Sequence, residues 1–78
     1  MAPTNERIAK VVSEIIEVPA QEVAAAAQFT DLSRWDSLAH LNVVLGIEQE
    51  FGVQFDIEEL TQITGVDAVA ALLARKLQ

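Results

Sequence analysis

Apolar residues in the N-terminal part of the chain recur with the period of a helix. They stand at positions i, i+3, i+4, i+7 and i+8, namely Ile8, Val11, Val12, Ile15 and Ile16. This spacing places them in a single stripe on one helical face. Although β-branched residues also suit a strand, the polar and small residues between them break strict alternation. The pattern therefore predicts a first helix that ends before Pro19, with Thr4 as its N-cap.

The segment 19–36 is a long connection without a clear hydrophobic period. Its alanine run at 24–27 predicts a short helical turn. Within the remainder, Phe29 and Leu32 are isolated apolar residues, which we expect to anchor the connection onto the rest of the fold. Long connections of this kind are uncommon in compact domains and often carry function.

The second helix is predicted to start at Ser37 and to end at Phe51. Asp36 suits the N-cap position, because its carboxylate can accept a backbone N–H of the first turn. Gly52 suits the C-terminal end, where a left-handed conformation commonly stops a helix. This helix therefore has clear signals at both ends.

Two shorter helical segments complete the predicted fold. Asp56 is expected to cap a short third helix over 57–62, and Thr64 is expected to start a fourth helix with Asp67 as the partner in a capping box. The residues expected to line the fourth helix are apolar: Val66, Val69, Ala70, Leu73 and Leu77. The expectation is an all-α, four-helix bundle in a single domain covering residues 1–78.

The second helix carries more apolar surface than one buried face needs. One sector, spanning about a third of its circumference, holds the set His40, Val43, Val44, Ile47 and Phe51, whereas an adjacent sector holds Leu38, Leu41 and Leu45. Either the helix is central and buried on both sides, or the leucine sector faces solvent or a partner. The angular pattern alone does not favour one of these two interpretations over the other.

Composition removes several classes of function. The 78 residues include 12 acids, 5 bases and no cysteine, for a net charge of −7. This charge argues against binding nucleic acid or an anionic membrane, since such binding relies on Lys and Arg. The absence of cysteine excludes disulfides, cysteine-based zinc sites and a side-chain thiol nucleophile. A single histidine also excludes a histidine metal cluster, so we expect no metal site.

No apolar run approaches the roughly 18 residues of a membrane-spanning helix, and the first residues lack the pattern of a signal peptide. We therefore expect a cytoplasmic protein without membrane insertion.

Ser37 is the most informative polar residue. A hydroxyl in the first turn of a helix is where an attached phosphate would be electrostatically favoured. The ordinary interpretation is an extra polar residue beside the N-cap. A Ser-His-Asp triad fits poorly, because His40 is on the core side of the predicted helix. No catalytic residues and no enzymatic activity are expected.

The chain resembles the acyl carrier proteins over essentially its whole length. The resemblance is carried by Asp31-Leu32, Asp36-Ser37-Leu38, Leu41, Val44 and Ile47–Val53, followed by Phe55, Ile63 and Val69. It implies a bundle of three main helices and a short one, with a 4′-phosphopantetheine arm on Ser37. A separate phosphopantetheinyl transferase would attach this arm from coenzyme A, and its terminal thiol would carry an acyl group as a thioester. Asp36 would cap the helix and help to hold the transferase's magnesium.

The resemblance also implies a partner-facing ridge formed by Leu38, Leu41, Leu45 and Glu48. Its partners would be the transferase and acyl ligase, synthase or acyltransferase enzymes of fatty-acid, polyketide or related lipid biosynthesis. The acyl chain would be the cargo, and the carrier itself would be a monomer. The alternatives are an aminoacyl or peptidyl carrier that uses the same Ser37 arm, or an unmodified helical interaction module.

The sequence departs from the family pattern at several positions. Arg34 and Trp35 precede the Asp-Ser-Leu motif where many carriers have glycine, and Asn42 and Gln49 replace residues that are often acidic. The second helix therefore has fewer acidic residues than the family pattern, which suggests a specialised carrier.

Three further residues each have a structural and a functional interpretation. We expect Trp35 to anchor the loop, the alternative being contact with the arm or a partner. His40 is expected to bond a neighbouring segment, a pH switch being the unsupported alternative. For Gly46, close approach of a helix is favoured over space for cargo.

Overall fold

The computed structural model describes residues 4–77, and within them the chain is helical without strands. The elements are α1 (Thr4–Ile16), α2 (Ala20–Ala25), a 3₁₀ turn η1 (Phe29–Asp31), α3 (Ser37–Phe51), α4 (Ile57–Leu60) and α5 (Val66–Lys76). The all-α expectation is confirmed, with α1, α3 and α5 as the main helices and α4 as the short one. The helix α2 lies in the connection, where the sequence predicts only a short helical turn.

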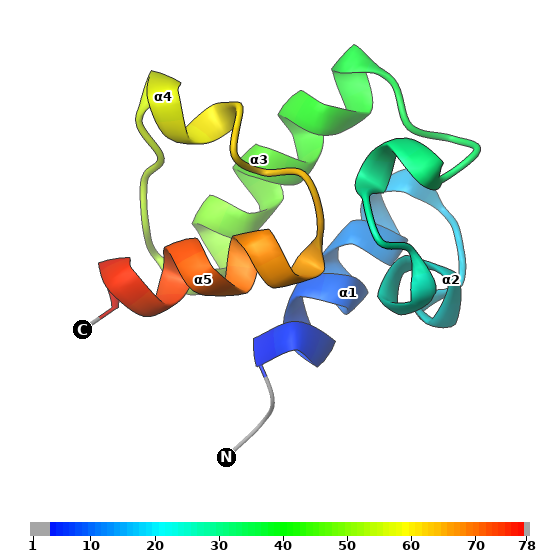
Figure 1. Cartoon of the computed structure of the whole chain (residues 1–78), viewed down its shortest axis with the longest axis horizontal. Coiled ribbons are helices and arrows are strands. Elements are labelled where there is room, and N and C mark those ends of the chain that lie inside the picture. Colours follow the sequence, from blue (N-terminus) through cyan, green and yellow to red (C-terminus); the bar gives the residue numbers. More distant parts are fainter. Residues whose placement is uncertain (1–3, 78) are drawn as a thin grey trace.

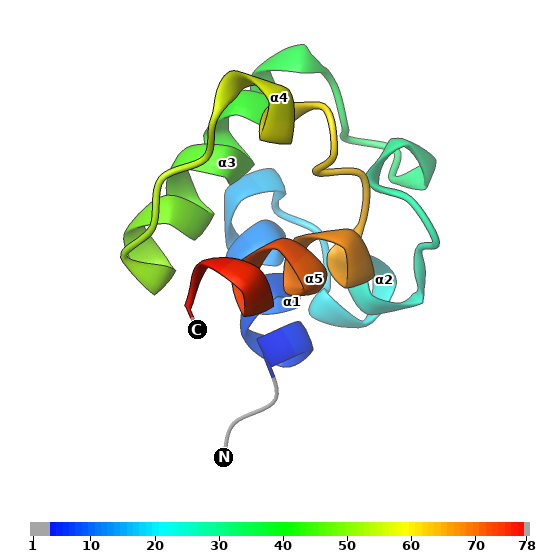
Figure 2. The ribbon, with the colours of Figure 1, turned by 60° about the vertical axis from the view of Figure 1, so that its left-hand side comes forward.

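Helix α1 is the centre of the packing. It contacts α2, α3 and α5, and the two views of the ribbon show it lying among these three helices (Figures 1 and 2). Its predicted apolar stripe supplies Ile8 and Val12, which are fully buried. These side chains meet apolar residues of the other helices, including Val43 and Ile47 of α3 and Val69 of α5. The core thus fixes α3, on which the candidate site lies.

The predicted N-cap of α1 is wrong. Thr4 is itself helical, so it is not the N-cap, and the residues before it lie outside the described part of the chain. The end of α1 agrees with the prediction, because the helix stops at Ile16 before Pro19.

The long connection is more ordered than its sequence predicts. Helix α2 starts directly after Pro19 and ends at Ala25, so the predicted turn at 24–27 is misplaced. The carbonyl of Pro19 accepts the N–H groups of Glu22 and Val23, at 3.0 and 3.3 Å. Val23 is fully buried. This short helix is therefore placed by one buried valine rather than by its alanines.

Phe29 and Leu32 anchor the rest of the connection, as predicted. Both are buried, with 1% and 8% of their surface exposed. The backbone N–H of Phe29 also donates to the carbonyl of Thr64 at 2.7 Å, which ties the connection to the loop before α5. The segment preceding the candidate site is thereby fixed at a second point.

The predicted start of α5 is wrong. Gly65, not Thr64, is the N-cap, and Asp67 accepts a hydrogen bond from Asn5 Nδ2 at 2.9 Å instead of completing a capping box. A Cβ atom at Gly65 would lie 2.8 Å from the carbonyl oxygen of Ala27. The helix start is therefore set by this close approach of the connection.

The C-terminal elements differ in extent from the prediction. Helix α4 ends at Leu60 rather than at residue 62, while Asp56 is its N-cap as predicted. Leu77, expected to line α5, lies beyond its last residue and is 55% exposed. The other predicted lining residues of α5 are buried or partly buried: Val66, Val69, Ala70 and Leu73.

Gly46 allows α1 and α3 to approach closely. A Cβ atom there would clash with Cδ1 of Ile15 and lie 3.2 Å from Cγ1 of Val11. This supports the close-approach interpretation over space for cargo. We expect Gly46→Leu to destabilise the fold by about 1–3 kcal/mol through overpacking. Gly46→Ala should be nearly neutral, because its helix propensity gain of about 1 kcal/mol offsets displacement of the Ile15 side chain. Urea unfolding measures both, and an unchanged midpoint for Gly46→Leu would contradict this packing.

An ion pair joins α4 to α5. Lys76 Nζ lies 2.7 Å from Glu59 Oε1, and this bond, with the backbone N–H of Asp56, lowers the pKa of the Glu59 carboxyl below its ordinary value of 4.5.

Because this pKa is lowered in the folded state, its contribution to stability is present above about pH 4.5 and is lost as pH falls through the lowered pKa. We expect Lys76→Met to destabilise the protein near neutral pH and to lose this effect on acidification. Denaturant unfolding at a series of pH values measures the difference from wild type. Arg75→Met also removes one positive charge but leaves the Lys76–Glu59 bond intact, so it serves as the control. A Lys76→Met effect that does not change with pH would contradict the prediction.

Candidate functional site

Ser37 occupies the first position of α3, and its side chain is exposed. Asp36 precedes it in extended conformation, and its Oδ1 accepts the N–H of Ala39 at 2.7 Å. The predicted N-cap is thus confirmed. The N–H groups of Ser37 and Leu38 have no acceptor within the helix, because the first turn has no preceding carbonyls to supply one. They remain available to an anion attached at the Ser37 hydroxyl.

Aromatic side chains hold the segment that leads into Ser37. The half-buried Trp35 ring stacks on Phe29, with centroids 4.7 Å apart and planes inclined by 26°. Its edge contact with His40 has a centroid distance of 5.7 Å. Trp35 is therefore a loop anchor, as predicted.

His40 links α3 to the end of α4. Its Nε2 lies 2.9 Å from the carbonyl oxygen of Leu60. The predicted bond to a neighbouring segment is confirmed. Since this ring nitrogen is directed at a carbonyl, it is not positioned as a base for Ser37.

The leucine sector of α3 faces solvent. Leu38, Leu41 and Leu45 are 65%, 51% and 50% exposed. On the other apolar sector Val43, Val44 and Ile47 are at most 3% exposed. The interpretation that α3 is buried on both sides is therefore wrong, and the helix presents an apolar ridge of three leucines, which we call the leucine ridge.

Both acidic residues of α3 make contacts within the molecule. Glu48 is partly buried, and its Oε2 accepts the N–H of Phe55 at 2.8 Å. Glu50 pairs with Arg7 at 3.0 Å. The carboxylate of Glu48 thus holds the chain segment that follows α3, which is a contact that sequence reasoning missed. No local pattern signals it, because the partner is a backbone group in a loop.

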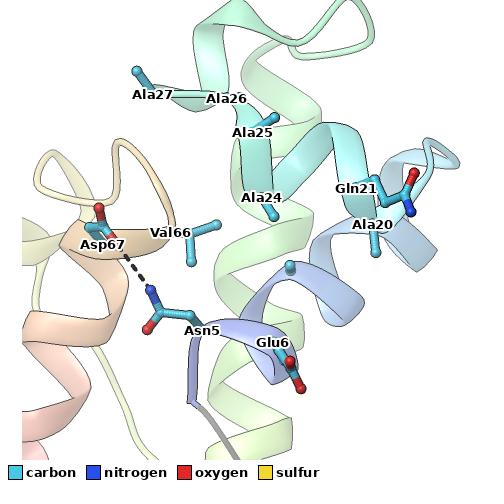
Figure 3. A pocket seen from close by; sticks show the side chains of 11 residues that line it. Asn5, Glu6, Ala20, Gln21, Ala24, Ala25, Ala26, Ala27, Val66 and Asp67 are labelled. Atoms are coloured by element: carbon cyan, nitrogen blue, oxygen red, sulfur yellow. Dashed lines mark hydrogen bonds between the residues drawn. The ribbon is translucent and has the colours of Figure 1, made fainter.

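A hollow of about 440 Å³ adjoins the serine and is lined by Thr30, Trp35, Asp36, Ser37 and His40. Arg34 is exposed and borders a separate hollow that includes Asp36 and Leu38. A third hollow, of about 520 Å³, lies between α1, α2 and the start of α5, beside the Asn5–Asp67 hydrogen bond (Figure 3). It includes neither Ser37 nor the leucine ridge. Ser37 thus lines the hollow beside Trp35.

This arrangement offers chemistry of one kind: an accessible hydroxyl at a helix start, able to carry a phosphate ester. The chain matches a family model described as the phosphopantetheine attachment site over residues 6–73. This match defines a helical domain whose cofactor is 4′-phosphopantetheine.

Two relatives make the assignment more specific. The chain is 35% identical over 72 residues to the acyl carrier protein of Petrotoga mobilis, covering 92% of this chain and 85% of that protein. It is 33% identical over 76 residues to the chloroplastic acyl carrier protein of Brassica napus, covering 96% of this chain and 56% of that protein, so it spans about half the length of the plant relative. The chain belongs to the acyl carrier protein family.

Acyl carrier proteins hold acyl groups on a phosphopantetheine arm and work with synthases and transferases. They are carriers rather than catalysts. The family assignment favours this interpretation over an aminoacyl carrier or an unmodified interaction module. No helix within residues 4–77 is long and apolar enough to cross a membrane.

Proposed function

We propose that Ser37 is the attachment residue for the phosphopantetheine arm. In this reaction the Ser37 oxygen attacks the phosphorus atom of coenzyme A that bears the pantetheine. A new P–O bond forms, the pyrophosphate bond breaks, and adenosine 3′,5′-bisphosphate leaves with the bonding electrons. The serine proton passes to a base on the transferase. The observation that carries the proposal is an exposed hydroxyl at the first position of a capped, 15-residue helix.

The residues around Ser37 suit a phosphodiester. The N–H groups of Ser37 and Leu38 and the positive end of the α3 dipole favour negative charge there. Asp36 keeps the helix start in place through Oδ1. Its other carboxylate oxygen is proposed to meet the transferase's magnesium. When attached, the arm supplies the thiol that holds an acyl group as a thioester.

The leucine ridge is proposed as the docking surface for partner enzymes. Its partners are the phosphopantetheinyl transferase and an acyl ligase, synthase or acyltransferase of fatty-acid, polyketide or related lipid biosynthesis. The net charge of −7 attracts basic partners at long range. The contact itself is apolar, because Glu48 and Glu50 bond within the protein. Through its bond to Phe55, Glu48 therefore stabilises the edge of the leucine ridge.

We further propose that residues 1–78 act as one monomeric carrier domain without catalytic activity of its own. A cytoplasmic location stays a prediction, since one relative is named as chloroplastic.

Intact-protein mass spectrometry tests the attachment. After incubation with coenzyme A and a broad-specificity transferase, the protein is expected to gain the mass of one phosphopantetheine. A protein that stays at its starting mass under conditions that load a known carrier would contradict the proposal.

The ridge is tested by Leu41→Asp, which places a charge on its centre. Because central apolar contacts dominate many interfaces, we expect kcat/KM of the transferase for this variant to fall by roughly tenfold or more. Leu77→Asp is the matched control, since Leu77 is similarly exposed, at 55% against 51%, but lies after α5. Equal losses in the two variants would show that the effect is not specific to the ridge.

A further inference from the structure

We propose that the hollow between α1, α2 and the start of α5 is a second docking surface, which receives a basic helical segment of a partner protein. This surface is separate from the leucine ridge, and the inference does not depend on attachment at Ser37. The chemistry of the hollow defines the occupant: an aliphatic side chain flanked by lysine or arginine residues on the same face of a helix.

The hollow has the size and the lining of a binding surface. Its volume of about 520 Å³ lies within the range of roughly 300–1,000 Å³ that is typical of ligand pockets. Six of its eleven lining residues are alanines, of which Ala20, Ala24 and Ala25 of α2 are exposed. Because alanine side chains are short, the wall leaves room for an aliphatic side chain that enters from outside.

The walls of the hollow are fixed before any partner binds. Ala9 of α1 is 4% exposed, and α2 is held against α1 by the fully buried Val23. The 2.9 Å hydrogen bond from Asn5 to Asp67 joins the start of α1 to the start of α5, and Ala24 is directed from α2 toward α1 (Figure 3). A preformed groove between helices suits an amphipathic helix, and its rigidity lowers the entropy that binding would cost.

The charge at the rim favours a basic occupant. Glu6 of α1 and Asp67 of α5 line the hollow, and no lining residue found within 4–77 is Lys or Arg. The side chain of Asn5 is a neutral donor, so its bond leaves the negative charge of Asp67 in place. A lysine beside the entering aliphatic residue can lay its methylene stem on the alanines and keep its ammonium group at this acidic rim.

The hollow and the attachment region are lined by different residues. Neither Ser37 nor a leucine of the ridge lines the hollow. A partner bound in the hollow would therefore hold the carrier while another enzyme reaches Ser37. Loading of Ser37 by the transferase should proceed at an unchanged rate when the hollow is saturated, and a competitive loss of loading would contradict this separation.

A designed peptide tests the surface. The probe is an alanine-based helical peptide with one central leucine and a lysine four residues before and after it, titrated into ¹⁵N-labelled protein without the arm. The largest amide shifts are expected at Glu6, Ala24 and Val66, with small shifts along the leucine ridge. The same peptide with glutamates in place of the lysines should bind at least roughly tenfold more weakly, because its charges would face the acidic rim.

Variants of the hollow test the same contact. Ala24→Phe fills the hollow and should weaken binding of the lysine peptide by roughly tenfold, whereas Ala71→Phe, at an exposed position of α5 outside the hollow, should not. Glu6→Gln should weaken binding by roughly two- to fivefold, as expected for an exposed ion pair. Glu14→Gln removes an exposed acid of the same helix outside the hollow and is its control.

Shifts centred on the leucine ridge, or equal binding of the lysine and glutamate peptides, would overturn this docking surface. The free amine n-butylammonium, which reproduces a lysine side chain, should bind far more weakly than the peptide. Equal affinity of the amine and the peptide would overturn protein docking in favour of a small amine ligand. Each of these results leaves the mass gain at Ser37 unaffected, so failure of this inference is distinguishable from failure of the attachment.

Discussion

Ser37→Ala is expected to abolish loading by coenzyme A and the transferase, with no mass gain detectable where wild type is fully converted. The substitution removes the only oxygen that the proposal allows to form the phosphoester bond. It leaves the N-cap of α3 in place, since that bond is made by Asp36. Circular dichroism and the denaturation midpoint should therefore remain close to those of wild type.

Ser33→Ala is the matched control for this experiment. Ser33 is also an exposed serine, and it lies in the same connection just before the helix start. It should load at the wild-type rate. Loading of Ser37→Ala, or failure of Ser33→Ala, would contradict the assignment of the attachment residue.

Phe29→Ala is expected to have the largest effect on stability, at about 3–5 kcal/mol. The ring is the largest fully buried side chain among residues 4–77, and it supports both the connection and the Trp35 ring. Its removal leaves a cavity that helices fixed by α1 cannot easily fill. Urea unfolding measures the loss, and Trp35 emission should also report greater exposure of the indole.

Ile57→Ala provides the comparison for that measurement. Ile57 is 85% exposed, so its truncation should change stability by no more than about 0.5 kcal/mol. Similar losses for Phe29→Ala and Ile57→Ala would show that Phe29 is not an anchor of the fold.

The elements with strong local signals could be predicted from the sequence. The stripe from Ile8 to Ile16, the Asp36 cap and Gly52, whose φ is 67°, define the main helices through patterns within each segment. The two apolar sectors of α3 were also evident, but their angles alone did not decide between a helix buried on both sides and an exposed leucine sector. The prediction that Ser37 carries the arm came from its hydroxyl at a helix start and from the family pattern.

The remaining features depend on contacts between distant segments. Asp67 completes no capping box, because Gly65 is the N-cap, and its Oδ1 instead accepts from Asn5, 62 positions away in sequence. The carboxylate of Glu48 accepts the N–H of Phe55 in the following loop, and α2 forms around one buried valine with too few residues to show a period. Such features are set by tertiary geometry, on which local sequence patterns carry no information.

Tryptic peptide mapping of the loaded protein tests attachment at Ser37. Cleavage after Arg34 separates Ser37 from Ser13 and Ser33, because the chain contains no Lys or Arg between Trp35 and Ala74. We expect phosphopantetheine on the peptide 35–75, in which Ser37 is the only serine, and fragmentation should place it on that residue. Recovery of the arm on the peptide 11–34, or on a threonine of 35–75, would contradict attachment at Ser37.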